Sequence, residues 1–164
     1  MELKQLRKEL AAEAEKAGIC KEWLGKILTA PSREYLLQLF IKGLDFSILH
    51  DFPSNRLADE FSDIAPHFGI FVNREGTWPA ANKKRVIARD AIVMPATFDG
   101  FSVGEVYALH GSGVEVRASG RAIVSVTVED GAQVEATATE YAQVKIFHHG
   151  GQIVTHGNVT VINP

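Results

Sequence analysis

The sequence predicts an α+β protein in which an N-terminal helical module is followed by a C-terminal β-solenoid. The main observation is a ten-residue period in the second half of the chain, where three columns of mostly apolar residues repeat. Within each unit these positions alternate, as expected for a short strand that buries one face. A fixed period indicates stacked repeats. The columns are Val114, Val124, Val134, Val144, Val154; Val86, Ala96, Val106, Val116, Val126, Ala136, Ile146, His156; and Ala88, Phe98, Ala108, Ala118, Val128, Ala138, His148, Asn158.

The second observation is that turn residues fall between the units, as at Asp99-Gly100, Ser119-Gly120 and Asp130-Gly131. Ten residues are too few for two strands and the crossings between two sheets. We therefore expect ten-residue half-coils, 20-residue coils and two facing parallel sheets. An antiparallel β-sandwich, which the Asp-Gly turns also suit, and an intertwined trimeric β-structure remain as alternatives. The solenoid is favoured because stacking requires the same column in every unit.

The third observation is helical spacing of apolar residues in the first half. Helices are predicted over residues 3–17, over 21–28, after a Ser32 N-cap, and over 55–61. The helix that follows Ser32 is apolar over most of its girth and is expected to be the buried one. The predicted domains are a helical module at 1–72, a linker loop at 73–84 and a solenoid repeat domain at 85–164.

Four short segments carry a resemblance. They are Gly18-Ile19-Cys20-Lys21-Glu22-Trp23, Gly43-Leu44-Asp45-Phe46, Phe52-Pro53-Ser54-Asn55 and Gly69-Ile70-Phe71-Val72. They resemble landmarks of small uncharacterised proteins of prophages and mobile elements of gut anaerobes, which also have a repetitive β-rich tail. The resemblance covers roughly residues 15–72. It implies a phage-associated or accessory role and transfers no catalytic residue.

The repeat tail is also similar to bactofilin-type polymerising solenoids in its short rungs, which are rich in Val and Ala and punctuated by Gly. Those proteins consist of the β-core with brief flexible ends, whereas this chain has a helical half. End-to-end polymerisation therefore does not carry over directly from the resemblance.

Composition and charge limit the classes of function that the chain can have. The net charge of −3 lacks the basic excess typical of nucleic-acid binders, and the Lys83-Lys84-Arg85 cluster is interpreted as a solvated link. Cys20 is the sole cysteine, which excludes an intrachain disulfide and is expected to be a small buried hydrophobe. The sequence begins without an apolar signal core and has no run long enough to span a bilayer. We expect a cytoplasmic protein with no membrane contact and no cofactor.

Candidate chemistry comes from a few side chains. His148, His149 and His156 are weak metal-ligand candidates, although a polar end to the core explains them as well. Asp130 and Glu140 occupy the same turn column and would be the acids of an unrecognised hydrolase. The aromatic residues expected to face outward and to form a ligand or partner surface are Trp78, Tyr107, Tyr141 and Phe147.

These observations favour a non-enzymatic structural or protein-interaction scaffold associated with phage or mobile-element biology. A solenoid offers end rungs and flat faces for pairing, so we expect a homo-oligomer and allow for another protein partner. The alternatives are a carbohydrate- or peptide-binding module and a hydrolase that uses turn acids.

Overall fold

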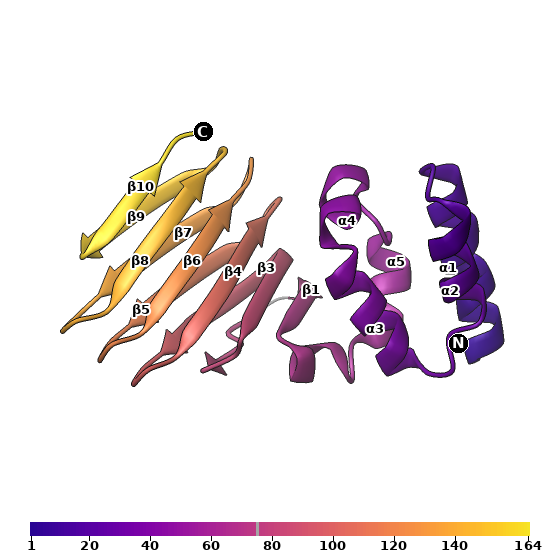
Figure 1. Ribbon diagram of the computed structural model, residues 1–164, viewed down its shortest axis with the longest axis horizontal. Helices are drawn as coiled ribbons and strands as arrows, with labels where there is room; N and C mark the ends of the chain where they lie inside the picture. Colours follow the sequence, from indigo (N-terminus) through magenta and orange to yellow (C-terminus); the bar gives the residue numbers. More distant parts are fainter. Residues whose placement is uncertain (75) are drawn as a thin grey trace. The chain divides into compact units, whose positions relative to one another are not determined.

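The computed structural model describes residues 1–74 and 76–164, and the chain forms two compact units, Met1–Ala65 and Pro66–Pro164. The first unit is helical and the second is a parallel β-solenoid, which confirms the α+β class with a C-terminal solenoid (Figure 1). The units divide before the expected end of the helical module at residue 72, because strands before residue 85 pair into the solenoid.

The helical unit contains α1 (Leu3–Lys16), α2 (Lys21–Leu28), α3 (Arg33–Lys42), α4 (Leu44–His50), α5 (Asn55–Ala58) and the 3₁₀ helix η1 (Asp59–Phe61). A second 3₁₀ helix, η2 (Ala65–Phe68), spans the boundary between the two units. The sequence-based prediction missed α4. Gly43, which has φ of −101°, directly joins α3 to α4.

Local chemistry explains how α3 starts and why it is buried. The Ser32 hydroxyl accepts a hydrogen bond from the Tyr35 backbone N–H at 3.1 Å, which confirms the predicted N-cap. Leu36, Leu37 and Leu39 lie in the core of the unit.

The prediction for Cys20 was wrong. Cys20 is the N-cap residue of α2 and is exposed, because it lies before the first turn of the helix and outside its packed face.

The described residues of the solenoid form ten strands: β1 (Ile70–Arg74), β2 (Ala80–Ala81), β3 (Arg85–Phe98), β4 (Val103–Leu109), β5 (Gly113–Ala118), β6 (Ile123–Val128), β7 (Gln133–Ala138), β8 (Gln143–His148), β9 (Gln152–Gly157) and β10 (Val159–Ile162). We name the layer β1-β3-β4-β6-β8-β10 sheet A and the layer β2-β3-β5-β7-β9 sheet B. Strand β3 is long enough to contribute its first half to sheet A and its second half to sheet B. The two layers are visible in Figure 1.

The strand pairs of the described residues are parallel, as a solenoid requires and an antiparallel sandwich does not. Paired residues lie 20 positions apart through most of the domain, as in Val106 beside Val126 and Val126 beside Ile146. Two ten-residue units therefore make one coil, one unit in each sheet.

The three predicted columns form the core up to residue 146. Their members on β3 to β8 are buried between the sheets, from Val86 to Ile146. The columns fail in the last coil, because Val154 pairs with Glu135 and His156 pairs with Thr137, both of which face outward. The inward assignments of Val154 and His156 were therefore wrong. Paired residues are 20 positions apart between β5 and β7 but 19 apart between β7 and β9, and this one-residue shift exchanges the two faces of the strand.

A small-residue column, which the sequence analysis did not identify, explains the shift. The turns before β5, β6, β7 and β8 each end on a buried small residue: Ser112, Ala122, Ala132 and Ala142. The turn before β9 lacks this residue, and Gly151 at φ of +76° takes the chain directly into the strand. A side chain there would collide with the Ala132 carbonyl oxygen, 2.4 Å from the position of a Cβ. Glycine is therefore required at Gly151.

Candidate functional site

The terminal coil, which we define as β9 and β10, is the part of the solenoid whose interior is open. Residues that face inward by register lie on it: Ile153 beside Val134, Val159 beside Val144 and Val161 beside Ile146. Their partners on the preceding coil are buried, whereas Val161 is 36% exposed and Ile153 and Val159 are half-buried. Thr155, which pairs with the buried Ala136, is the polar residue on this inward side. The terminal coil therefore presents an uncharged and largely apolar interior between two edge strands.

The edges of the terminal coil carry no charged side chain. None of the residues after Lys145 is Asp, Glu, Lys or Arg, and β9 and β10 consist largely of Ile, Val and Thr. Edge strands of folded proteins usually carry charges, above all Lys, because an uncharged β-branched edge pairs with other strands. The terminal coil lacks this protection and has the composition of a strand that is normally paired.

The opposite end of the solenoid is closed. Phe71 on β1 and Ala80 on β2, which begin the two sheets, are 2% and 4% exposed. Trp78 packs against this core, with its ring centroid 6.4 Å from that of Phe71. The Arg74 guanidinium lies 4.6 Å from the centre of the indole ring. The two ends of the solenoid therefore differ. Trp78 packs against the core at the first coil, whereas exposed aliphatic residues lie on the last coil.

The three candidate histidines do not converge. His148 is held in place by contacts of Nδ1 with Asn163 Oδ1 and of Nε2 with the Gly151 carbonyl, both at 3.0 Å. His156 lies on the outward side of sheet B, 3.3 Å from Glu135, and His149 is exposed in a turn. Among the described residues, no group of three His, Cys, Asp or Glu side chains gathers to hold a metal ion.

The candidate acids Asp130 and Glu140 lie at opposite ends of β7. Asp130 is in the turn before this strand and Glu140 is in the turn after it, and both are exposed. A six-residue strand separates them by about 20 Å, which is far beyond the spacing of a glycosidase pair. The ten-residue column placed them together, but successive turns lie on opposite edges of a 20-residue coil.

The four predicted surface aromatics occupy three different places. Tyr107 and Phe147 share one outward column of sheet A, with Thr127 between them. Tyr141 projects from the turn between β7 and β8 and is 74% exposed. Trp78 packs against the first coil. The register therefore does not gather these four rings into one platform.

A different group, the aromatic corner, comes together instead: Phe101, Val103, Arg121, Ile123 and Tyr141. Phe101, Arg121 and Tyr141 occupy equivalent positions in turns 20 residues apart, and Val103 pairs with Ile123 on the adjoining strands. Phe101 is 82% exposed, and the Arg121 guanidinium lies 5.4 Å from the centre of the Tyr141 ring. The sequence analysis missed Phe101 because its position becomes visible only when turns are compared every 20 residues.

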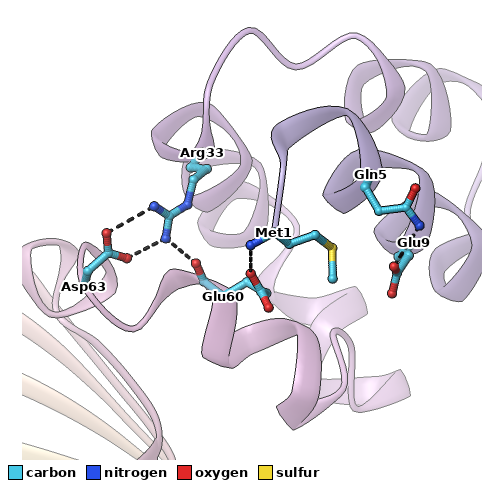
Figure 2. A network of polar contacts seen from close by, with 6 residues as sticks. All are labelled: Met1, Gln5, Glu9, Arg33, Glu60 and Asp63. Carbon is cyan, nitrogen blue, oxygen red and sulfur yellow. Dashed lines mark hydrogen bonds and ion pairs between the residues drawn. The ribbon is translucent and has the colours of Figure 1, made fainter.

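Figure 2 shows a polar network in the helical unit. The Arg33 guanidinium donates to the Asp63 carboxylate and to the Glu60 carbonyl, while the Met1 amino group donates to the Glu60 carboxylate at 2.7 Å. The hydrogen bond from Arg33 lowers the pKa of Asp63 below its ordinary value. These contacts join α1 and α3 to the end of the unit, so their role is structural.

Comparison with known proteins finds no matching family model, no matching curated protein and no matching solved structure. The fold and its surfaces define the class: a helical unit joined to a parallel β-solenoid with one closed and one open coil. Within the described part of the chain, no helix combines the length and apolar character needed to cross a membrane.

Proposed function

We propose that the protein is a non-enzymatic scaffold that self-associates through its terminal coil. The observation that carries this proposal is the contrast between buried inward columns in the earlier coils and exposed inward residues on two uncharged edge strands. Unpaired edge N–H and C=O groups and exposed Val and Ile side chains are satisfied together when another β-edge docks. A role in phage or mobile-element biology stays a prediction that rests on the sequence resemblance.

The expected result of Val161→Lys is a folded protein of lower oligomeric mass. Val161 faces the interior of the terminal coil and is partly exposed, so a lysine reaches water in the free chain but places a charge inside a docked interface. The measurement is light scattering after size exclusion over a range of concentrations, with circular dichroism as the check on folding.

The matched control is Gln143→Lys, which places the same charge at an exposed outward position on the neighbouring strand β8. This variant should keep the oligomeric mass of the unmodified protein. A parent protein that is monomeric at all concentrations would contradict the proposal, as would equal behaviour of the two lysine variants.

A second candidate function is carbohydrate binding at the aromatic corner, favoured by two exposed rings on either side of a guanidinium. Pyranose rings stack on flat aromatic faces, and a guanidinium donates hydrogen bonds to hydroxyl groups. Phe101 and Tyr141 are two coils apart, which is about 10 Å at the spacing of strands in a sheet. An extended glycan presents sugar faces along such a line.

On this second proposal, Tyr141→Ala should weaken glycan binding about tenfold, from the loss of about 1.4 kcal/mol of stacking. A glycan array identifies the ligand, and titration calorimetry then measures its affinity. Tyr107→Ala, which removes a ring of the outward column of sheet A, is the control and should leave the affinity unchanged. A broad array without any bound glycan would end this proposal.

A further inference from the structure

We infer that the partner on the terminal coil is a second copy of this chain, docked about a two-fold axis so that the assembly closes as a dimer. This inference deepens the proposed function, because it names the partner, the pairing and the number of copies. It rests on the proposed self-association through the terminal coil. It is carried by the directions of the edge strands, their side-chain alternation and the closed first coil.

The surface of the terminal coil that a partner must cover consists of the two edge strands, β10 of sheet A and β9 of sheet B. An occupant must present two strands at the separation of sheets A and B, with an apolar and uncharged interior between them, to match β9 and β10. The terminal coil of a second copy has this form. Any charged edge would instead bring an unpaired charge over Ile153, Val159 and Val161, which is costly.

Two-fold symmetry fixes the direction of pairing. Rotation about an axis perpendicular to the solenoid reverses the second copy end for end, so each edge strand meets its counterpart antiparallel. Strand β9 has six residues and β10 has four. Pairing each strand with its own counterpart matches these lengths, whereas pairing β9 with β10 would leave part of β9 uncovered.

The alternation of side chains restricts the register. In β10, Val159 and Val161 face the core while Thr160 and Ile162 face outward. A continuous interior requires inward residues opposite inward residues, and a shift of one residue would place valine on the solvent side. The axis therefore passes through Thr160, which sets Val159 opposite Val161 of the second copy, or through Val161 itself. In both registers the two Thr160 side chains lie on the same outward face near the axis.

The closed first coil explains why the assembly stops at two. A filament needs a second open end, but Phe71 and Ala80 at the other end of the solenoid are buried and Trp78 packs over this core. A contact that uses the same surface on both copies is self-complementary and leaves no free site.

Thiol cross-linking combined with mass measurement tests this arrangement. The exposed Cys20 is first replaced by serine (Cys20→Ser). Thr160→Cys is then introduced into this variant, and the purified protein is treated with a short bismaleimide. Residues on one face of an antiparallel pair have Cβ atoms about 5 Å apart when opposite and about 7 Å apart when diagonal. We expect at least about tenfold more covalent dimer from Thr160→Cys than from Val103→Cys, which lies on β4, three strands from the edge of sheet A.

The outcomes separate the two proposals. A dimer mass by light scattering, with cross-linking at Thr160→Cys that Val161→Lys abolishes, supports the two-fold dimer. A dimer that cross-links at Val103→Cys instead overturns it in favour of pairing through the sheet face, and a larger assembly or a filament overturns closure at two. In the first case the terminal coil is not the interface, so the proposed function fails as well. In the second case self-association through the terminal coil still holds. A monomer at all concentrations overturns this inference together with the proposed function.

Discussion

Val126→Asp is expected to unfold the solenoid. Val126 lies on β6 at the centre of its column, is fully buried, and pairs with Val106 on one side and Ile146 on the other. A carboxylate there has no partner and no water, and an isolated buried ion costs several kcal/mol even after relaxation. This cost is a large part of the 5–15 kcal/mol, roughly, that stabilises a typical domain. Urea unfolding followed by circular dichroism measures the loss.

The matched control for this prediction is Thr127→Asp, one residue further along the same strand. Thr127 faces outward between Tyr107 and Phe147 and is half-exposed, so its substitution places the same charge in contact with water. The expected change in unfolding free energy is within about 1 kcal/mol. If the two variants unfold at the same urea concentration, the column is not the interior of a solenoid.

Gly157→Ala is expected to disrupt the terminal coil while leaving the earlier coils folded. Gly157 ends β9 at φ of +82°, and a Cβ there would lie 1.9 Å from the backbone oxygen of Ala138. The left-handed conformation costs a residue with a side chain about 1–2 kcal/mol, and the collision forces the backbone to move as well. Hydrogen exchange should therefore show lost protection in β9 and β10 and retained protection in β4 to β7.

Gly100→Ala separates the two causes. Gly100 also has a positive φ, of +59°, but a Cβ there would meet nothing within 4 Å. The Gly100→Ala variant should lose only about 1 kcal/mol of unfolding free energy, the conformational cost of the positive φ, without local opening of the terminal coil. Equal effects of Gly100→Ala and Gly157→Ala would mean that the contact with Ala138 is unimportant. Gly157→Ala should also lower the oligomeric mass, because it removes the proposed interface.

The sequence predicted the helical unit in part. Helix α2 and the Ser32 cap of α3 agree with the apolar spacing and the cap chemistry, because both are local properties. Helix α4 was missed because it follows α3 directly after Gly43, and the negative φ of that glycine does not show in composition. The exposure of Cys20 depends on which helix faces pack together, and residue type alone does not decide this.

The predicted sites depended on whether the repeat that matters is ten residues, one strand and turn, or 20 residues, one full coil. A ten-residue repeat places Asp130 and Glu140 in one column, but the chain reverses direction between the sheets, so only every second turn shares an edge. This is why the hydrolase pair separates and why Phe101, Arg121 and Tyr141 come together. The same arithmetic misplaced Val154 and His156, because one missing residue before β9 exchanges the faces of a strand.

The amino-acid sequence by itself determined that the chain has a helical part and a stacked β-part, and its three columns predicted most of the side chains that fill the interior from Val86 to Ile146. These features follow from the alternation of apolar and polar residues and from the repeat period, both of which can be read from residues close together in the sequence. Only the tertiary structure decided which turns share an edge, where the stacking register slips, and that one end of the core is covered while the other is open. Those features depend on which distant residues lie side by side, and hydrogen bonding between coils sets this rather than any short segment.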